Sequence, residues 1–207
     1  MKDDLKATYN RIAEDWHRDH QKDDWWFEGL KAFTRLLSKG SSVLDIGCGG
    51  GTPAKYLAAE GLRVTGIDFS EKMIAIARRN VPQGKFLVMD AHELEKLKEE
   101  WDGIYMQAFL LHIPKNETEE IVKRALLYLR PNGLLLTAVK EQKEGQSEEE
   151  IKKENTYGYP YERFFSYYTV AELESLYKRL DLAVVYKTIR TVNKTRWLQI
   201  IGKKENR

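Results

Sequence analysis

A short glycine-rich segment constrains the fold of this chain more than any other feature. Val43–Ile46 is an apolar run that contains Asp45, and four of the five residues that follow, 47–51, are glycines. Glycine has no Cβ, so the chain can turn tightly there and a ligand can approach the bare backbone. Thr52 can cap a helix and Pro53 suits the first helical turn. The segment therefore predicts a strand, a turn and a helix N-terminus that presents free N–H groups to a ligand.

Strand and helix signals alternate along the rest of the chain. Ser70 is a good N-cap for the next helix, and Asn80 with Pro82 marks its end. Buried strands separated by helices are typical of a parallel sheet covered on both faces. The last two strands share a short connection, so we expect them to be antiparallel. The expected strands are Val43–Ile46, Arg63–Ile67, Lys85–Met89, Gly103–Met106, Leu134–Val139, Leu182–Ile189 and Arg196–Ile201.

Composition places the chain among ordinary globular domains. It has 207 residues, of which 42% are hydrophobic and 32% charged, with a net charge of +2. We expect a single α/β domain over residues 1–207, with a doubly wound, mostly parallel seven-stranded sheet and an antiparallel C-terminal strand. The balanced charge argues against nucleic-acid binding. No apolar run is long enough for a signal peptide or a membrane span, so we expect a cytoplasmic protein, as a monomer or homodimer.

Two segments lie outside this α/β pattern. Residues 1–38 have a helical pattern and contain Trp16, Trp25 and Trp26, and residues 141–168 run from a charged stretch into an aromatic cluster. Ligands of open α/β sheets bind at the carboxyl ends of the strands, which both segments should flank. We interpret residues 1–38 as a lid and residues 141–168 as a substrate-side insertion.

Three carboxylates coincide with expected strand ends. Asp45 precedes the glycines, Asp68 ends the second strand, and Asp90 follows the third. A carboxylate at the position of Asp68 can accept hydrogen bonds from both hydroxyls of a ribose, which indicates an adenosine cofactor. Three negative charges would repel a pyrophosphate but suit a ligand that carries an ammonium and a sulfonium, as S-adenosylmethionine does.

Four segments carry a resemblance to a known family: VLDIGCGGG, VTGIDFSEKMIAIAR, FLVMDAHEL and WDGIYMQAFLLHIP, the last followed by LRPNGLLL. Together they resemble the class I S-adenosylmethionine-dependent methyltransferases of the small-molecule type, over nearly the whole chain. The resemblance implies the Rossmann-like methyltransferase fold. It also implies that S-adenosylmethionine is the cofactor and S-adenosylhomocysteine the product.

The resemblance also implies roles for individual residues. Asp45 with the Gly47–Gly49 backbone would hold the methionine part, Asp68 the ribose, and Asp90 the adenine amino group. The full set implied for the cofactor is Tyr9, Trp16, Asp45, Gly47, Cys48, Gly49, Asp68, Phe69, Met73, Asp90, Ala91, His92, Met106 and Gln107. The residues expected to bind the substrate are Trp25, Trp26, Tyr157, Tyr159, Tyr161 and Arg163.

The histidines allow two interpretations. His112 should lie near the methyl donor, and its unperturbed pKa suits a general base, although a histidine between apolar residues is more often structural. His17 and His20 stand among aspartates, but no known ligand spacing is met, so we expect a solvated helix face and no metal. Cys48 is the single cysteine and excludes an internal disulfide.

The sequence hypothesis is the transfer of a methyl group from the sulfonium to a nucleophilic atom of a small molecule. A charged leaving group needs orientation and exclusion of water more than it needs a base. One alternative is a regulatory protein that binds S-adenosylmethionine without turnover. Another is an NAD-dependent oxidoreductase, but the third glycine position of a G-x-G-x-x-G pattern that starts at Gly47 is occupied by Thr52.

Overall fold

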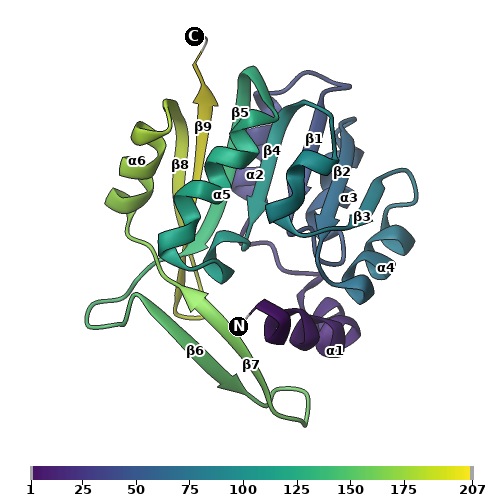
Figure 1. The fold of residues 1–207 in the computed structure, drawn as a ribbon, viewed down its shortest axis with the longest axis vertical. Helices are drawn as coiled ribbons and strands as arrows, with labels where there is room; N and C mark the ends of the chain where they lie inside the picture. Colours follow the sequence, from purple (N-terminus) through teal and green to yellow (C-terminus); the bar gives the residue numbers. More distant parts are fainter. Residues whose placement is uncertain (1, 206–207) are drawn as a thin grey trace.

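A seven-stranded sheet forms the centre of the molecule in the computed structural model, which describes residues 2–205, with side chains from residue 4 onward. The strand order is β3-β2-β1-β4-β5-β9-β8. All neighbours from β3 to β5 are parallel, whereas β9 is antiparallel to both β5 and β8. The carboxyl ends of the parallel strands meet at the lower edge of the sheet in Figure 1. The expected doubly wound fold is confirmed.

The helices are α1 (Lys2–His20), α2 (Phe27–Arg35), α3 (Thr52–Ala59), α4 (Glu71–Asn80), α5 (Lys115–Leu127) and α6 (Val170–Arg179), with short 3-10 helices η1 (Ala91–Lys96) and η2 (Leu110–His112). The strands are β1 (Ser42–Ile46), β2 (Arg63–Asp68), β3 (Lys85–Val88), β4 (Trp101–Gln107), β5 (Leu129–Lys140), β6 (Glu149–Glu154), β7 (Tyr161–Ser166), β8 (Leu182–Val192) and β9 (Thr195–Lys204).

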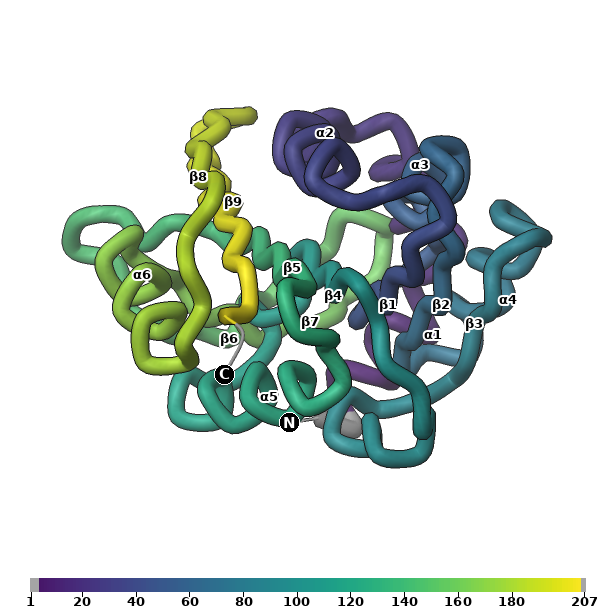
Figure 2. The backbone as a smooth tube through the Cα atoms, turned by 90° about the horizontal axis from the view of Figure 1, so that it is seen from above, coloured from purple at the N-terminus to yellow at the C-terminus, as the bar shows by residue number. Residues whose placement is uncertain are grey.

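Two hydrophobic clusters cover the two faces of the sheet. One cluster holds Leu30 of α2, Leu57 of α3 and Ile74 of α4. The other holds side chains of η1, α5 and α6, among them Ile121 and Leu173. In Figure 2 the helices α2 and α3 lie on one side of the sheet and α5 on the other. A sheet that is apolar on both faces needs a helical layer on each, which explains the uninterrupted apolar strands seen in the sequence.

Local signals in the sequence fix several element ends. The Ser70 hydroxyl accepts a hydrogen bond from the Met73 N–H at 3.1 Å, so α4 is capped as expected. The cap of α3 is Gly51, not Thr52, because Gly51 adopts φ 77° and Thr52 is already the first helical residue. A left-handed backbone at this position favours glycine. The expected role of Thr52 as the cap is therefore wrong, while Pro53 lies in the first turn as expected.

Helix α1 and the β6–β7 hairpin lie across the carboxyl edge of the sheet (Figure 1). The hairpin pairs Glu149–Glu154 with Tyr161–Ser166, and it reaches α1 through a hydrogen bond from the Thr8 hydroxyl to the Glu162 carbonyl at 3.0 Å. Residues 141–168 thus contain a two-stranded sheet, a structure that the charged sequence EEIKKE does not predict. We refer to α1 and the β6–β7 hairpin together as the cover.

Candidate functional site

A cavity of about 530 Å³ lies between the carboxyl edge of the sheet and the cover. The ends of β1, β2 and β4 supply Asp45, Asp68 and Gln107, and α1 supplies Tyr9 and Trp16. A pocket of this size accommodates a cofactor-sized ligand and is typical of the carboxyl edge of an open α/β sheet.

The glycine loop forms the floor of this cavity. Gly47 adopts φ 73°, and a Cβ there would lie 2.8 Å from Cδ2 of Phe109, so a larger residue would be both strained and crowded. Gly49 adopts φ 51°, but a Cβ at that position would meet no atom within 4 Å. Gly49 therefore leaves open the space that a ligand would fill.

Gly49→Ala tests whether that open space is used. We expect the affinity for S-adenosylhomocysteine to fall by about tenfold or more, because the new methyl group would occupy ligand volume. Gly40→Ala is the matched control, since Gly40 also has a positive φ, 81°, and open space around it, yet does not line the cavity. Calorimetric titration and thermal melting of both variants separate backbone strain from ligand exclusion. Equal losses of affinity in the two variants would contradict the assignment.

Asp68 connects the glycine loop to the start of α4. Its Oδ2 accepts a hydrogen bond from the Gly49 N–H at 3.0 Å, and its Oδ1 accepts one from the Ser70 N–H at 2.9 Å. Burial raises the pKa of Asp68 to about 6, and these two backbone donors oppose the rise. The carboxylate is fixed by the backbone and lines the cavity, where each oxygen keeps a lone pair for a further donor.

Asp45 is a buried carboxyl group with an unused oxygen. It is 1% exposed, and its Oδ2 has no hydrogen-bond partner in the described part of the chain. Burial, and secondarily the charge of Asp68, raises the pKa of Asp45 to about 8. An unpartnered buried oxygen is costly, and a cationic or N–H-bearing ligand in the cavity would satisfy it.

At the far end of the cavity, Asp90 caps η1 and holds His92. The Asp90 Oδ1 accepts from the His92 N–H at 2.8 Å and lies 2.6 Å from the ring nitrogen Nδ1. Both residues line the cavity together with Ala91. This end combines a carboxylate with an apolar wall that includes Phe69 and Met89, an environment suited to a planar ring with an exocyclic amine.

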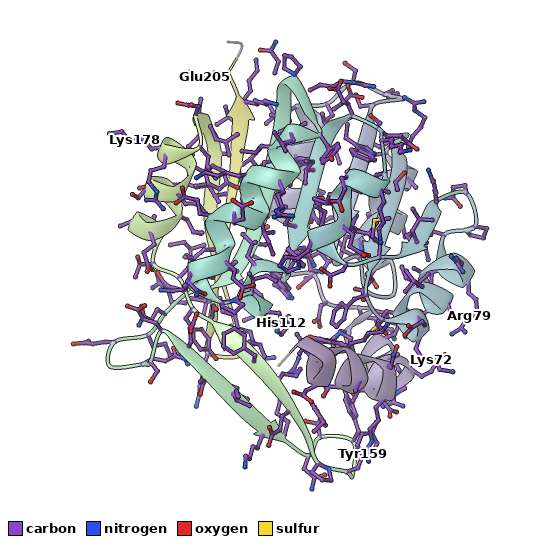
Figure 3. All side chains as sticks on the ribbon, viewed as in Figure 1. Lys72, Arg79, His112, Tyr159, Lys178 and Glu205 are labelled. Atoms are coloured by element: carbon purple, nitrogen blue, oxygen red, sulfur yellow. The ribbon has the colours of Figure 1, made fainter. Side chains whose placement is uncertain are left out.

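His112 connects η2 to both parts of the cover. Its Nδ1 lies 2.7 Å from the Phe164 carbonyl, and its Nε2 lies 2.7 Å from the Tyr9 hydroxyl. A carbonyl oxygen only accepts, so Nδ1 carries the proton and Nε2 accepts from Tyr9. Burial, with the nearby Arg163 charge, lowers the pKa of His112 to about 3. Figure 3 shows His112 at the level between the sheet edge and α1.

These contacts change the interpretation of His112. Both ring nitrogens are engaged by protein groups, so no lone pair is available to take a proton from a substrate. The general-base role expected from the sequence therefore does not fit this arrangement. The neutral ring instead joins the carboxyl edge of the sheet to α1 and β7.

Arg163 occupies the centre of the cover. Its Nε and Nη2 donate to the two carboxylate oxygens of Glu154 at 2.6 and 2.7 Å, and its guanidinium lies 4.4 Å from the centre of the Trp16 ring. It is 7% exposed and lies beside the Tyr9 hydroxyl. Planar, bidentate pairing of this kind is a property of arginine. The pair joins β6, β7 and α1 into one unit.

The structure brings most of the predicted site residues to this one cavity. Four do not line it. Met106 is fully buried in the core, because alternation along β4 directs it into the α5 side of the sheet and only Gln107 emerges at the edge. The tyrosines at 157, 159 and 161 pack on one another and on α1 outside the cavity, and Figure 3 shows Tyr159 beyond α1 at the end of the hairpin. The predicted residues that line the cavity are Tyr9, Trp16, Trp25, Trp26, Asp45, Gly47, Cys48, Gly49, Asp68, Phe69, Met73, Asp90, Ala91, His92, Gln107, His112 and Arg163.

The structure therefore places three of the expected substrate contacts, Tyr157, Tyr159 and Tyr161, away from the cavity. The Tyr159 ring receives the Arg11 guanidinium at 4.1 Å, and its hydroxyl donates to Asp15 at 3.2 Å, both residues being on α1. Tyr157 and Tyr161 are stacked with ring centres 5.6 Å apart. These tyrosines fasten the hairpin to α1 rather than facing a ligand.

Several cavity residues were missed by the sequence interpretation. Lys140 ends β5 and lines the cavity, as do Phe165 of β7 and Trp197 of β9. His17 also lines it, with Nδ1 2.6 Å from the position a Cβ on Gly50 would take. Among the described residues there is no group of three or more histidine, cysteine, aspartate or glutamate side chains placed to hold a metal ion. Within residues 2–205, no helix has the length and apolar character needed to cross a membrane.

Comparison with known families gives the site its context. Residues 43–133 match the family model described as a methyltransferase domain, and this range contains the glycine loop, Asp68 and Asp90. The match covers less than half of the 207 residues. It supports the family expected from the sequence over this range, and helix α1 and the β6–β7 hairpin lie outside it.

Curated relatives align mainly with the methyltransferase domain. A ubiquinone biosynthesis O-methyltransferase of Coxiella burnetii is 34% identical over 105 residues, covering 49% of this chain and 44% of the relative. The enzyme of the same name from Hydrogenovibrio crunogenus is 28% identical over 138 residues, covering 61% of this chain and 56% of the relative. The chain thus spans about half the length of these curated relatives.

Solved structures share the fold over nearly the whole chain. The 1,6-didemethyltoxoflavin-N1-methyltransferase of Burkholderia thailandensis, with bound 1,6-didemethyltoxoflavin and S-adenosylhomocysteine, has a TM-score of 0.77 at 19% identity, and the match covers 98% of this chain and 88% of that one. The magnesium protoporphyrin IX methyltransferase of Synechocystis, with S-adenosylhomocysteine, has a TM-score of 0.77 at 16% identity and covers 99% and 100%. At these identities the likeness concerns the fold, including the regions outside the methyltransferase domain.

Proposed function

We propose that this protein transfers a methyl group from S-adenosylmethionine to a small molecule bound beneath the cover. The observation that carries the proposal is the unpartnered Oδ2 of Asp45, buried beside the open space above Gly49. An orphaned carboxylate beside a bare glycine backbone fits the ammonium and carboxylate of a methionine moiety. The match of residues 43–133 to a methyltransferase domain and the ligands of the structural neighbours support the same conclusion.

The proposed cofactor residues divide along the cavity. Asp45 and the Gly47–Gly49 backbone would hold the methionine end, Asp68 the ribose hydroxyls, and Asp90 with the Ala91 backbone the adenine. S-adenosylmethionine would supply a methyl group already activated by the positive sulfur. The protein would then act by orientation and water exclusion, which are worth about 7–11 kcal/mol when the geometry is good. The cover, with Tyr9 and Trp16 on the cavity wall, would exclude water.

We also propose residues 1–38 as the N-terminal lid of this site. Helix α1 contributes Leu5, Tyr9, Trp16, His17 and His20 to the cavity wall. Movement of α1 would widen the exit for a cofactor held under these side chains. Small-molecule acceptors, rather than nucleic acid, fit a cavity of about 530 Å³ and the net charge of +2.

Labelled S-adenosylmethionine and metabolite extracts test the proposal directly. We expect wild-type protein to transfer an isotopic methyl label to a low-molecular-mass product and to bind S-adenosylmethionine in calorimetry. Binding without any labelled product would favour a regulatory protein that binds the cofactor without turnover. Absence of binding at high micromolar concentration would overturn the proposal, and protection from heat unfolding by NAD instead would favour the oxidoreductase alternative.

The protonation of Asp45 predicts how cofactor affinity depends on pH. The free protein keeps the Asp45 proton below its pKa of about 8, so binding of a cation must expel that proton. Affinity for S-adenosylmethionine should therefore rise with pH between about 5.5 and 7, by at most about tenfold per pH unit. Calorimetry near pH 7 in buffers of different ionisation enthalpy measures the released proton, and because Asp68, with a pKa of about 6, is mostly ionised there, Asp45→Asn should abolish most of the release. An affinity independent of pH in the wild type would contradict this role.

A further inference from the structure

Lys140 is a cation in the cavity without an anionic partner. It is the last residue of β5, and its side chain is partly buried. No hydrogen bond or ion pair joins its ammonium to any described residue, whereas Arg163, the other cation on this side of the cavity, is satisfied by Glu154. The three N–H donors of a lysine need acceptors, and the nearby protein groups provide none.

Aromatic side chains surround this ammonium. Nζ of Lys140 lies 4.1 Å from the centre of the Phe165 ring and 5.5 Å from that of Trp197. Trp197 is the cross-strand partner of Lys140 and stacks on Trp25 with ring centres 3.6 Å apart. The faces of aromatic rings stabilise a cation, and flat rings also form the walls of a pocket for a planar ligand.

The position of Lys140 relates this corner to the methyl donor. Ala138 pairs with Gln107 at the end of β4, and Lys140 lies two residues further along β5, on the same side of the strand as Ala138 and beyond the edge of the sheet. A molecule held by Lys140 therefore lies next to the proposed methionine end of the cofactor. Burial is the main reason that the pKa of Lys140 falls to about 8, and the charges of Arg163 and Lys152 lower it further. The charges of Glu154 and Glu150 oppose the fall only in part. An anionic ligand would reverse the fall.

We propose that the acceptor is a planar, weakly acidic small molecule bound as its oxyanion, with Lys140 as the residue that selects the charge. This inference rests on the proposed methyl transfer. The acceptor oxygen would form its bond to the methyl carbon while the carbon–sulfur bond breaks and leaves its electron pair on sulfur. No proton is removed in this step, which agrees with the engagement of both nitrogens of His112 by protein groups.

Two pairs of probes test the inference, each made of an anion and a neutral compound of similar shape. Benzoate and benzamide form one pair, and 4-nitrophenolate and 4-nitroanisole form the other, each titrated into protein saturated with S-adenosylhomocysteine. We expect the wild type to prefer each anion over its neutral partner by about tenfold or more. Lys140→Met should lose this preference while its affinity for the neutral probes stays unchanged, and Lys140→Arg should keep part of it.

Lys152→Met is the matched control. Lys152 also places its ammonium near the Phe165 ring, at 5.5 Å, but it pairs with Glu150 and does not line the cavity. This variant should keep the anion preference. No preference in the wild type, or an equal preference in Lys140→Met, would overturn the inference. Titration with S-adenosylhomocysteine alone separates the two failures: if it binds wild type and Lys140→Met equally, only the acceptor assignment is wrong, and if it does not bind the wild type, the proposed function is wrong.

Discussion

Asp68→Ala should weaken the binding of S-adenosylmethionine by at least about 100-fold. The variant removes the acceptor proposed for two ribose hydroxyls, and a hydrogen bond to a charged group is worth about 1.5–3 kcal/mol. It also removes the hydrogen bonds that the Gly49 and Ser70 N–H groups donate to the Asp68 carboxylate at 3.0 and 2.9 Å. Loss of these bonds allows the glycine loop to move, which adds to the cost. Calorimetric titration of the purified variant measures the effect.

A second aspartate provides the control for fold stability. Asp102 lies at the start of β4, and its Oδ2 accepts from the Ser42 N–H at 2.7 Å, so it also connects two strands through the backbone. Asp102 does not line the cavity. Asp102→Ala should therefore lower the melting temperature without changing cofactor affinity. If Asp68→Ala binds as tightly as wild type, or if both variants lose affinity equally, Asp68 does not hold the ribose.

Glu154→Ala should destabilise the cover strongly. Arg163 is 7% exposed and would keep its charge without the carboxylate that now satisfies two of its donors at 2.6 and 2.7 Å. Removal of one partner from a buried ion pair costs about 3–5 kcal/mol, because the remaining buried charge loses its counter-charge. Hydrogen exchange should show faster opening of β6, β7 and α1. A protein of this size should also lose about 6–20 °C in melting temperature if the cover unfolds with the core.

Two further variants separate the cost of the unpaired Arg163 charge from a general loss of hairpin stability. Glu154→Ala combined with Arg163→Met removes both charges and should recover much of the lost stability. Glu162→Ala removes a carboxylate from the same hairpin, but its partner Lys153 is 3.6 Å away and both side chains are largely exposed. We expect this surface pair to contribute at most about 1 kcal/mol. A loss in Glu162→Ala as large as in Glu154→Ala would show that the hairpin is generally fragile.

The parallel part of the fold could be predicted because its signals are local. Each buried strand is a continuous apolar run, and residues such as Ser70 mark the helix ends in their immediate neighbourhood. The carboxylates at 45, 68 and 90 follow from the same logic, since parallel strands deliver their ends to one edge. The hairpin is different. Its strand β6 reads EEIKKE, a charged sequence that only pairing with β7 makes extended.

The missed and misplaced site residues depend on contacts between distant parts of the chain. Lys140 resembles a surface lysine in the sequence, and only the pairing of β5 with β9 places it opposite Trp197. Tyr159 belongs to an aromatic cluster that favours a substrate wall, yet Arg11 and Asp15 of α1 bind it on the outside. The engagement of His112 by Tyr9 and Phe164 likewise joins residues more than fifty positions apart. Such pairings have no local signal.

The division between residues 43–133 and the rest has a consequence for how such a protein can diversify. The matched range holds Asp45, Asp68 and Asp90, while Lys140, Trp197 and the cover lie outside it. Mutations that reshape the acceptor corner therefore need not disturb the groups proposed to hold the methyl donor. Because α1 and the hairpin are joined to each other through Thr8 with Glu162 and through Trp16 with Arg163, the two segments of the cover should evolve as a set. A chimera that exchanges residues 1–38 and 141–168 together should acquire a new acceptor, whereas exchange of either segment alone should leave the cavity open.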